Sequence, residues 1–209
     1  MRTCVIFCAG GFDRLLEPVG KDACVIAADG GLRHVRALGT RCDAILGDFD
    51  SLGFVPEGAD VFPVEKDDTD AMLAVRWGLA AGCGRFVIYG GLDGPRLDHT
   101  IANLQTLQFL AERGVAGYLV GLSYLATVIR NETVRFPESA KGILSLFCMG
   151  SDARGVTLEG LKYPLRGATL TAGFPLGVSN RFVNRDAAVT VENGSLLALY
   201  DRENGFPLR

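Results

Sequence analysis

Short apolar runs that each end in a glycine or an Asp–Gly turn constrain the fold of this 209-residue chain more than any other feature. The first three such runs cover residues 3–8, 23–28 and 44–46. A helical segment over residues 32–38, with Gly39 as its C-terminal cap, separates the second run from the third. Buried strands that alternate with helices are typical of a parallel sheet covered on both faces. The sequence therefore predicts an α/β fold for this part of the chain.

Two aspartates follow the third apolar run directly, in the sequence Gly47-Asp48-Phe49-Asp50-Ser51. If the strand continues, Asp48 and Asp50 point to the same side, because side chains alternate along a strand. Two carboxylates about 4 Å apart repel by roughly 4 kcal/mol at an effective dielectric constant of 20. At the carboxyl end of a strand, a bound Mg2+ ion would relieve this repulsion. An exposed acidic turn is the alternative that the motif alone leaves open.

More aspartates precede a helix that the apolar pattern predicts over residues 71–81. Asp67 and Asp70 are three residues apart, which places them on nearly the same side at a helix start. The alternative is a capping role, with Thr69 or Asp70 as the N-cap residue.

A glycine-rich loop follows a strand predicted over residues 85–89 and contains Arg96 and Asp98. Free N–H groups in such a loop, together with an arginine, are suited to binding phosphate. Asp98 is predicted to be the N-cap residue of a helix over residues 100–113, and metal binding is an equally open interpretation.

These aspartates are expected to converge, because the carboxyl ends of parallel strands lie at one edge of the sheet. The set comprises Asp48, Asp50, Asp67, Asp70 and Asp98. Carboxylates beside glycine-rich loops and an arginine suit the chemistry of a Mg2+-bound nucleotide, in which phosphate charge must be neutralised. The chain lacks the G-x-x-x-x-G-K-[ST] motif, so it is not a P-loop enzyme.

The pattern changes after about residue 115, where no long amphipathic helix is predicted. Short β-like runs cover residues 117–121, 125–129, 132–136, 142–148, 155–158, 168–171 and 187–200. We place a domain boundary near residue 130. The prediction is a Rossmann-like α/β domain over residues 1–130, followed by a small all-β sandwich over residues 131–209.

Composition and charge argue against several classes of function. A net charge of -3 gives no sign of a broad surface for nucleic acid or an anionic membrane. The longest apolar run, residues 143–149, is too short to span a bilayer, and the first residues do not resemble a secretory signal. The six cysteines show neither C-x-x-C nor a Cys/His metal spacing, so we interpret them as reduced core residues of a cytoplasmic protein.

An ordered series of short motifs resembles the thiamine pyrophosphokinase family. In the first half of the chain the motifs are Ala28-Asp29-Gly30-Gly31, Gly47-Asp48-Phe49-Asp50-Ser51, Lys66-Asp67-Asp68-Thr69-Asp70 and Arg96-Leu97-Asp98-His99. In the second half they are Gly160-Leu161-Lys162-Tyr163-Pro164-Leu165, Val178-Ser179-Asn180 and Asn193-Gly194-Ser195-Leu196-Leu197. Each motif is weak evidence alone, but their order and spacing over nearly the whole chain are specific.

The resemblance implies a homodimer that transfers the pyrophosphoryl group of ATP to the hydroxyl of thiamine, with Mg2+ required, giving thiamine diphosphate and AMP. It implies catalytic roles for Asp48, Asp50, Asp70 and Asp98, with the metal held by Asp48, Asp50 and Asp70. It implies ATP or phosphate binding by Asp29, Gly30, Gly31, Asp67, Thr69 and Arg96. Ser179 and Asn180 would bind thiamine, between the β domain of one subunit and the α/β domain of the other.

One departure from the family concerns the acceptor. Eukaryotic members carry a tryptophan in the last strand that stacks on the pyrimidine, whereas residues 196–199 offer none. Tyr163 and Phe182 are candidates for this stacking role, and core positions are the alternative for both. Two other functions stay open: a pyrophosphokinase for another primary alcohol such as a hydroxymethylpterin, and a non-catalytic regulator that binds a nucleotide or thiamine.

Overall fold

The structure, a computed structural model, describes residues 1–49, 53–61 and 68–209. The chain forms two compact units. The first comprises Met1–Leu107 and Val115–Leu122, and the second comprises Gln108–Gly114 and Ser123–Arg209. The predicted order, an α/β domain followed by an all-β domain, is confirmed. The change of unit falls between Leu122 and Ser123, and the boundary near residue 130 with its functional assignment of two domains stays a prediction.

The first unit is built on a parallel sheet. Its strands are β1 (Thr3–Phe7), β2 (Cys24–Ala28), β3 (Ala44–Gly47), β4 (Asp60–Val61), β5 (Arg85–Tyr89) and β6 (Ala116–Val120). Their order is β6-β5-β1-β2-β3-β4, and every neighbouring pair is parallel. The helices in this part of the chain are α1 (Leu32–Leu38), α2 (Asp70–Ala80) and α3 (Leu97–Ala111), with a short 3-10 helix, η1 (Asp29–Gly31).

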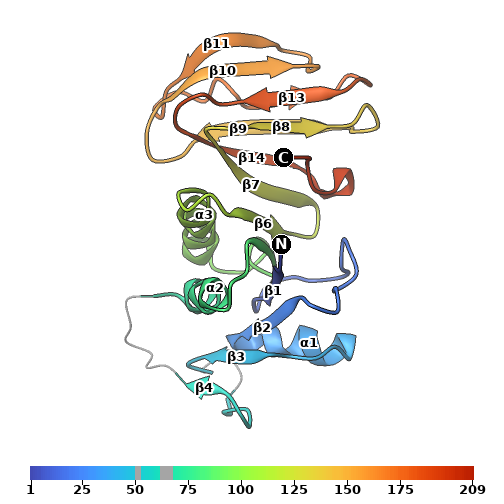
Figure 1. The fold of residues 1–209 in the computed structure, drawn as a ribbon, viewed down its shortest axis with the longest axis vertical. Coiled ribbons are helices and arrows are strands. Elements are labelled where there is room, and N and C mark those ends of the chain that lie inside the picture. Colours follow the sequence, from blue (N-terminus) through green and yellow to red (C-terminus); the bar gives the residue numbers. More distant parts are fainter. Residues whose placement is uncertain (50–52, 62–67) are drawn as a thin grey trace. The chain divides into compact units, whose positions relative to one another are not determined.

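Strands β1 and β2 are buried on both faces, which explains why they read as continuous apolar runs rather than as alternating patterns. The Cys4 side chain of β1 faces Gly78 of α2. Phe7 of the same strand lies on the opposite face, where its ring stacks on that of Tyr89 with a centroid distance of 5.5 Å. Figure 1 shows α1 and α2 on opposite sides of these strands. The predicted two-sided covering of the sheet is therefore confirmed.

Helix α1 and strand β5 have the predicted bounds, and Gly39 ends α1 with a φ of +60°. Helix α3 differs most from its prediction, because it begins at Leu97. The Arg96 carbonyl already accepts a hydrogen bond from the N–H of Thr100 at 3.2 Å. Asp98 consequently lies in the first turn of the helix, and its prediction as the N-cap residue is wrong.

The second unit contains two antiparallel sheets. Its elements are β7 (Tyr124–Arg130), β8 (Thr133–Phe136), β9 (Ile143–Cys148), β10 (Ala153–Glu159), β11 (Leu165–Leu170), β12 (Asn180–Arg181), β13 (Ala187–Thr190), β14 (Ser195–Asp201) and the 3-10 helix η2 (Arg202–Asn204). One sheet has the order β12-β9-β14-β7 and the other has the order β11-β10-β13-β8. Phe136 of β8 meets Tyr200 of β14 edge-on, with a centroid distance of 5.0 Å. Side chains of the two sheets therefore share one core, as the predicted sandwich requires.

Two details of this unit differ from the predicted strands. The run predicted over residues 187–200 is two strands, because a turn at Asn193 and Gly194 interrupts it. The N–H of Gly194 donates to Oδ1 of Asn131 at 2.9 Å, which anchors the turn. Strand β12 has two residues and pairs with β9, a contact too short to leave a pattern in the sequence.

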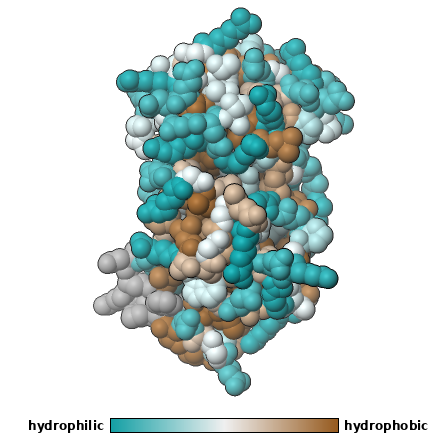
Figure 2. Space-filling view, viewed as in Figure 1, coloured by the Kyte–Doolittle hydropathy of each residue, from teal (hydrophilic) through white to brown (hydrophobic). Residues whose placement is uncertain are grey.

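The surface drawn in Figure 2 mixes hydrophilic and hydrophobic residues rather than presenting one continuous patch of either kind. No helix among the described residues combines the length and the apolar character needed to cross a membrane.

Candidate active site

Three aspartates from three elements meet at the carboxyl edge of the parallel sheet. Asp29 begins η1 directly after β2, Asp48 follows β3, and Asp70 begins α2. One carboxylate oxygen of each lies within 4.8 Å of those of the other two. At this separation and an effective dielectric constant of 20, each pair of charges repels by roughly 3 kcal/mol. We refer to Asp29, Asp48 and Asp70 as the carboxylate group. Its geometry is suited to a cation with oxygen ligands, as Mg2+ is.

The backbone around the carboxylate group is unusual. Asp29 has a φ of +47°, in the left-handed region that aspartate enters more readily than most residues. Phe49, directly after Asp48, has a φ of +59°. Gly47 lies so close to Asp29 that a Cβ at this position would stand 3.1 Å from the Asp29 Cα and Cβ atoms. Sparsely populated conformations of this kind gather at functional sites.

A cavity of about 680 Å3 lies beside the carboxylate group, within the first unit. Backbone from the loops after β1 and β5 lines it, at Gly10, Gly90, Gly91 and Gly94. Two cationic side chains, Arg33 and Arg96, also line it. Its volume is typical of sites for small molecules and cofactors. A cavity lined by glycine-rich loops, two arginines and three carboxylates is suited to a polyphosphate that carries a cation.

The glycine loops are held by close contacts. A Cβ at Gly10 would stand 2.5 Å from the carbonyl oxygen of Gly90. Asn103 donates from Nδ2 to the carbonyl oxygen of Gly91 at 2.8 Å, and both groups are buried. The ring nitrogen Nε2 of His34 lies 2.9 Å from the carbonyl oxygen of Gly10. The N–H of Gly10 also donates to the carbonyl oxygen of Gly90 at 2.9 Å, so the two glycine loops hold each other in place beside the cavity.

The pKa of the Cys8 thiol reflects the burial and the negative charge of the site. Burial, together with the nearby charges of Asp70 and Asp29, raises the pKa of this thiol to about 12. Cys8 therefore stays protonated at neutral pH and acts as part of the cavity wall.

The structure brings together some of the predicted residues of the α/β domain. Asp48 and Asp70 belong to the carboxylate group with Asp29. Gly30 and Gly31 complete η1 and are buried. Asp50 and Asp67 lie outside the described residues. Thr69 is the N-cap residue of α2, and its side-chain oxygen accepts from the N–H of Met72 at 3.2 Å.

Asp98 does not join the carboxylate group. Its carboxylate pairs with Arg96, with an Nη2–Oδ2 distance of 2.6 Å and an Nε–Oδ1 distance of 3.3 Å. The hydrogen bonds from Arg96 hold the pKa of Asp98 below its usual value. Both side chains are exposed. The structure thus offers Arg96 and Asp98 as a surface ion pair at the rim of the cavity, and the catalytic role of Asp98 stays a prediction.

The residues predicted to bind thiamine lie in the second unit. Asn180 is buried, and its amide holds the backbone of Tyr163 through Nδ2–O and N–Oδ1 hydrogen bonds of 2.7 and 3.0 Å. Ser179 is exposed, with a φ of +60°. Tyr163 is 56% exposed, whereas Phe182 is 8% exposed and packs on Phe136. Of the two stacking candidates, Phe182 is therefore a core residue and Tyr163 is accessible.

Sequence reasoning missed two lining residues, Arg33 and Asn103. Arg33 follows Asp29 by four positions, which places the two on one side of the turn and helix after β2. Asn103 stands three residues after Thr100 on α3, facing the glycine loop. Neither residue can be recognised as lining the cavity until the order of the strands in the sheet is known. Asp29 was predicted to bind ATP or phosphate in the same site as the other aspartates, and its carboxylate lies with those of Asp48 and Asp70.

Comparisons with known proteins agree with this site. Residues 17–118 match the family model described as "Thiamin pyrophosphokinase, catalytic domain", and residues 131–197 match "Thiamin pyrophosphokinase, vitamin B1 binding domain". The thiamine pyrophosphokinase of Bacillus subtilis is 27% identical over 147 residues, which cover 66% of this chain and 65% of that relative. The aligned region thus spans slightly less than two thirds of the curated relative.

Solved structures of similar proteins cover more of the chain. The crystal structure of thiamine pyrophosphokinase from Bacillus subtilis matches with a TM-score of 0.81 and 25% identity, over 95% of this chain and 98% of that one. A thiamin pyrophosphokinase family protein from Enterococcus faecalis matches with a TM-score of 0.80 and 26% identity, over 96% and 99% of the two chains. Because the two family models together match most of its length, the chain belongs to the thiamin pyrophosphokinase family.

Proposed function

We propose that this protein is an ATP-dependent thiamine diphosphokinase, which transfers the pyrophosphoryl group of ATP to the hydroxyl of thiamine. The observation that carries the proposal is the position of the carboxylate group and its cavity, inside the segment that matches the family's catalytic domain. The match of the second unit to the family's vitamin B1 binding domain supports thiamine as the acceptor.

In this proposal the carboxylate group holds Mg2+. Three carboxylate oxygens within 4.8 Å of one another form the hard, anionic donor set that Mg2+ prefers. When bound, Mg2+ neutralises phosphate charge on the nucleotide. Asp50, predicted as a further ligand, lies outside the described residues and remains part of the proposed metal set.

The other lining groups bind and orient the phosphates. Gly10, Gly90 and Gly91 line the cavity, and a Cβ at any of them would clash with neighbouring atoms of the protein, so this close loop packing requires glycine. Arg33 and Arg96 supply positive charge to the same cavity. Gly30, Gly31, Asp67 and Thr69 stay in the proposal as ATP-binding residues.

The transfer needs positioning more than a strong base. The thiamine hydroxyl oxygen forms a bond to the β-phosphorus of ATP, and the bond from that phosphorus to the oxygen bridging the α-phosphate breaks. AMP leaves with this oxygen, and the hydroxyl proton goes to a nearby carboxylate or to water. Alignment and charge neutralisation lower the barrier of such a step. Asp98 is proposed as a catalytic residue at the rim of the cavity, released from Arg96 when Arg96 binds phosphate.

We further propose that the protein is a cytoplasmic homodimer, with thiamine bound at the subunit interface near Ser179 and Asn180. Support comes from exposed apolar side chains: Phe174, Leu176 and Val178 shortly precede Ser179 in the sequence, and Tyr163 is hydrogen-bonded to Asn180 through its backbone. Exposed apolar residues that cluster in this way are typical of interaction surfaces. The six cysteines are free, as in a reducing compartment.

The experiment is a product analysis with ATP and Mg2+ and one acceptor at a time. Thiamine is expected to give equal amounts of AMP and thiamine diphosphate, and chelation of the metal is expected to abolish both. A hydroxymethylpterin in place of thiamine is the comparison. AMP formed only with the pterin would replace the acceptor, and nucleotide binding without AMP from either would refute the proposed reaction. Separation by size at several concentrations tests the dimer.

A further inference from the structure

A second cluster of possible ligands lies at the opposite edge of the parallel sheet. The Sγ atoms of Cys4, Cys24 and Cys83 all lie within 4.8 Å of one another, and all three side chains are buried. Cys4 is the second residue of β1, Cys24 is the first residue of β2, and Cys83 stands shortly before β5. These are the amino ends of the strands whose carboxyl ends lead into the candidate active site. We refer to these three residues as the thiol cluster.

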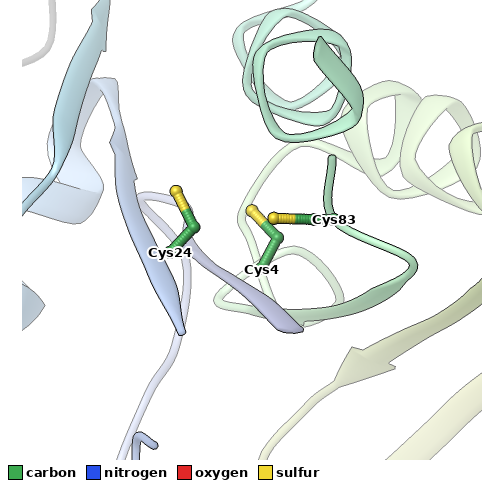
Figure 3. A group of neighbouring side chains, drawn as sticks. All are labelled: Cys4, Cys24 and Cys83. Carbon is green, nitrogen blue, oxygen red and sulfur yellow. The ribbon is translucent and has the colours of Figure 1, made fainter. Parts of the chain in front are cut away.

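Strand pairing explains why residues so distant in the sequence meet. Cys4 and Cys24 are direct partners in the parallel register of β1 and β2, and Thr3 of β1 is paired with Arg85 of β5. Figure 3 shows the Cys83 side chain directed toward Cys4, with Cys4 and Cys24 on neighbouring strands. The three sulfur atoms lie within 4.8 Å of one another. The cluster is thus assembled by the fold before any ligand arrives.

Helix α2 leaves room for these sulfurs. A Cβ at Gly78 would stand 2.8 Å from the Sγ atom of Cys4 and 2.6 Å from the ring of Phe86. Glycine at this point of the helix therefore keeps the position of the Cys4 sulfur open. The backbone holds the surrounding segment as well, since the N–H of Cys83 donates to the carbonyl oxygen of Gly78 at 3.0 Å.

The number of donors restricts the ion that the cluster can take. Within the described residues, the group contains three sulfur atoms and no further His, Cys, Asp or Glu ligand atom. Zinc in structural sites is almost always four-coordinate and tetrahedral, so three sulfurs alone do not satisfy it. Thiolates favour soft ions. The donor set is therefore suited to a soft ion that is complete with three sulfur ligands.

The total charge of the ion and its three thiolates restricts the choice of ion further, because burying a charged complex without a partner is costly. The charged groups that act on Cys24 are Asp43 and Arg2, and their effects on the Cys24 sulfur oppose each other. A divalent ion with three thiolates carries one negative charge, and a monovalent ion carries two. A trivalent ion with three thiolates is neutral, so its burial carries the smallest charge penalty of the three.

We propose that Cys4, Cys24 and Cys83 form a three-sulfur binding site for trivalent arsenic. Arsenous acid reacts with three thiols to form three As–S bonds and three molecules of water; each As–OH bond breaks, each thiol proton leaves with a hydroxide, and no oxidation state changes. The inference is independent of the proposed phosphoryl chemistry, because it uses residues at the other edge of the sheet.

The test is a titration of the whole, reduced protein with arsenite, followed by thermal unfolding and by native mass spectrometry. The expected result is one arsenic atom per chain and a Tm that rises with arsenite, because the folded chain presents three thiols that the unfolded chain keeps apart. Cys83→Ala, the substitution outside the strands, is expected to weaken binding at least tenfold. Cys148→Ala, which removes a half-buried thiol of the second unit, is the matched control and is expected to bind like the parent.

A second measurement needs no variant. Thiols that hold arsenic are expected to be protected when the complex is alkylated under mildly denaturing conditions, and peptide mapping is expected to find protection at Cys4, Cys24 and Cys83. Protection at other cysteines, unchanged binding by Cys83→Ala, or no binding to the folded protein would each overturn the proposal. Tighter binding of Zn2+ than of arsenite would overturn the argument from ligand number and charge.

Discussion

Gly31 links the end of β1 to the turn that carries Asp29, and replacing it with alanine tests this packing. A Cβ at Gly31 would stand 1.8 Å from the carbonyl oxygen of Phe7 and 2.4 Å from its carbonyl carbon. Since Cβ contacts under 3.0 Å are essentially never observed, Gly31 and the Phe7 carbonyl must move apart by at least 1.2 Å, which is the shortfall of the 1.8 Å contact from 3.0 Å. Phe7 is fixed between Ala27 and Tyr89 in the centre of the sheet. The strain therefore falls on backbone that cannot yield freely.

Overpacking of a core usually costs about 1–3 kcal/mol, and the rigid backbone at this position places Gly31→Ala near the upper end. For a chain of this size, about 3 kcal/mol corresponds to a Tm lowered by roughly 6–12 °C. Turnover at permissive temperature is expected to fall about a hundredfold, because Asp29 is displaced by about 1 Å. Gly20→Ala is the control, since a Cβ at Gly20 meets nothing within 4 Å. If both variants melted at the same temperature as the parent, the described packing of η1 against β1 would be refuted.

Three further substitutions test individual contacts. Thr69→Ala removes the N-cap hydrogen bond of α2 and is expected to destabilise the protein by about 0.5–2 kcal/mol in denaturant unfolding, whereas Thr69→Ser keeps the cap; equal stability of both variants would contradict the capping role. Asn180→Ala leaves the buried backbone groups of Tyr163 without partners and is expected to cost about 1–3 kcal/mol; an unchanged Tm would show that this amide does not hold the loop. Arg96→Gln is expected to raise the pKa of Asp98 toward its ordinary value, as followed by NMR titration of the carboxyl carbon. Because folding lowers the pKa of Asp98, the Arg96–Asp98 attraction stabilises the folded protein at a pH above the pKa that Asp98 has in the unfolded chain. This stabilisation is lost as the pH falls through the pKa of Asp98 in the folded protein. If the pKa of Asp98 were the same in Arg96→Gln as in the parent, Arg96 would not be the cause of the lowered pKa.

Much of the first unit could be predicted because strands β1, β2 and β5 are buried on both faces. Continuous apolar runs such as residues 24–28, each closed by glycine or aspartate, indicate parallel strands without any need of alignment. The rule that carboxyl ends share one edge then predicted the meeting of Asp48 and Asp70. The place of Asp29 in the same group depends on its left-handed backbone, which no local pattern reveals.

Other features depend on contacts between distant segments. The two-residue strand β12 exists because it pairs with β9, and its own sequence carries no strand signal. The start of α3 was predicted too far along the chain. Asp98 is a favourable N-cap residue by type, but its carboxylate is held by Arg96. The thiol cluster was invisible in the sequence, since Cys4, Cys24 and Cys83 meet only through the register of separate strands. Spacing rules for metal sites describe local motifs and miss sites that a sheet assembles.

The central claim is that Asp29, Asp48 and Asp70 act together on the Mg2+-bound nucleotide. The most direct test is the turnover of Asp29→Asn with ATP, Mg2+ and thiamine, because asparagine also tolerates the left-handed backbone at this position. Asp60→Asn, on the exposed strand β4 and not part of the carboxylate group, is the control. We predict that Asp29→Asn folds with the parent's Tm but loses at least about a hundredfold in turnover, while Asp60→Asn is unaffected. A folded Asp29→Asn protein that turns over like the parent would contradict the assignment of the carboxylate group.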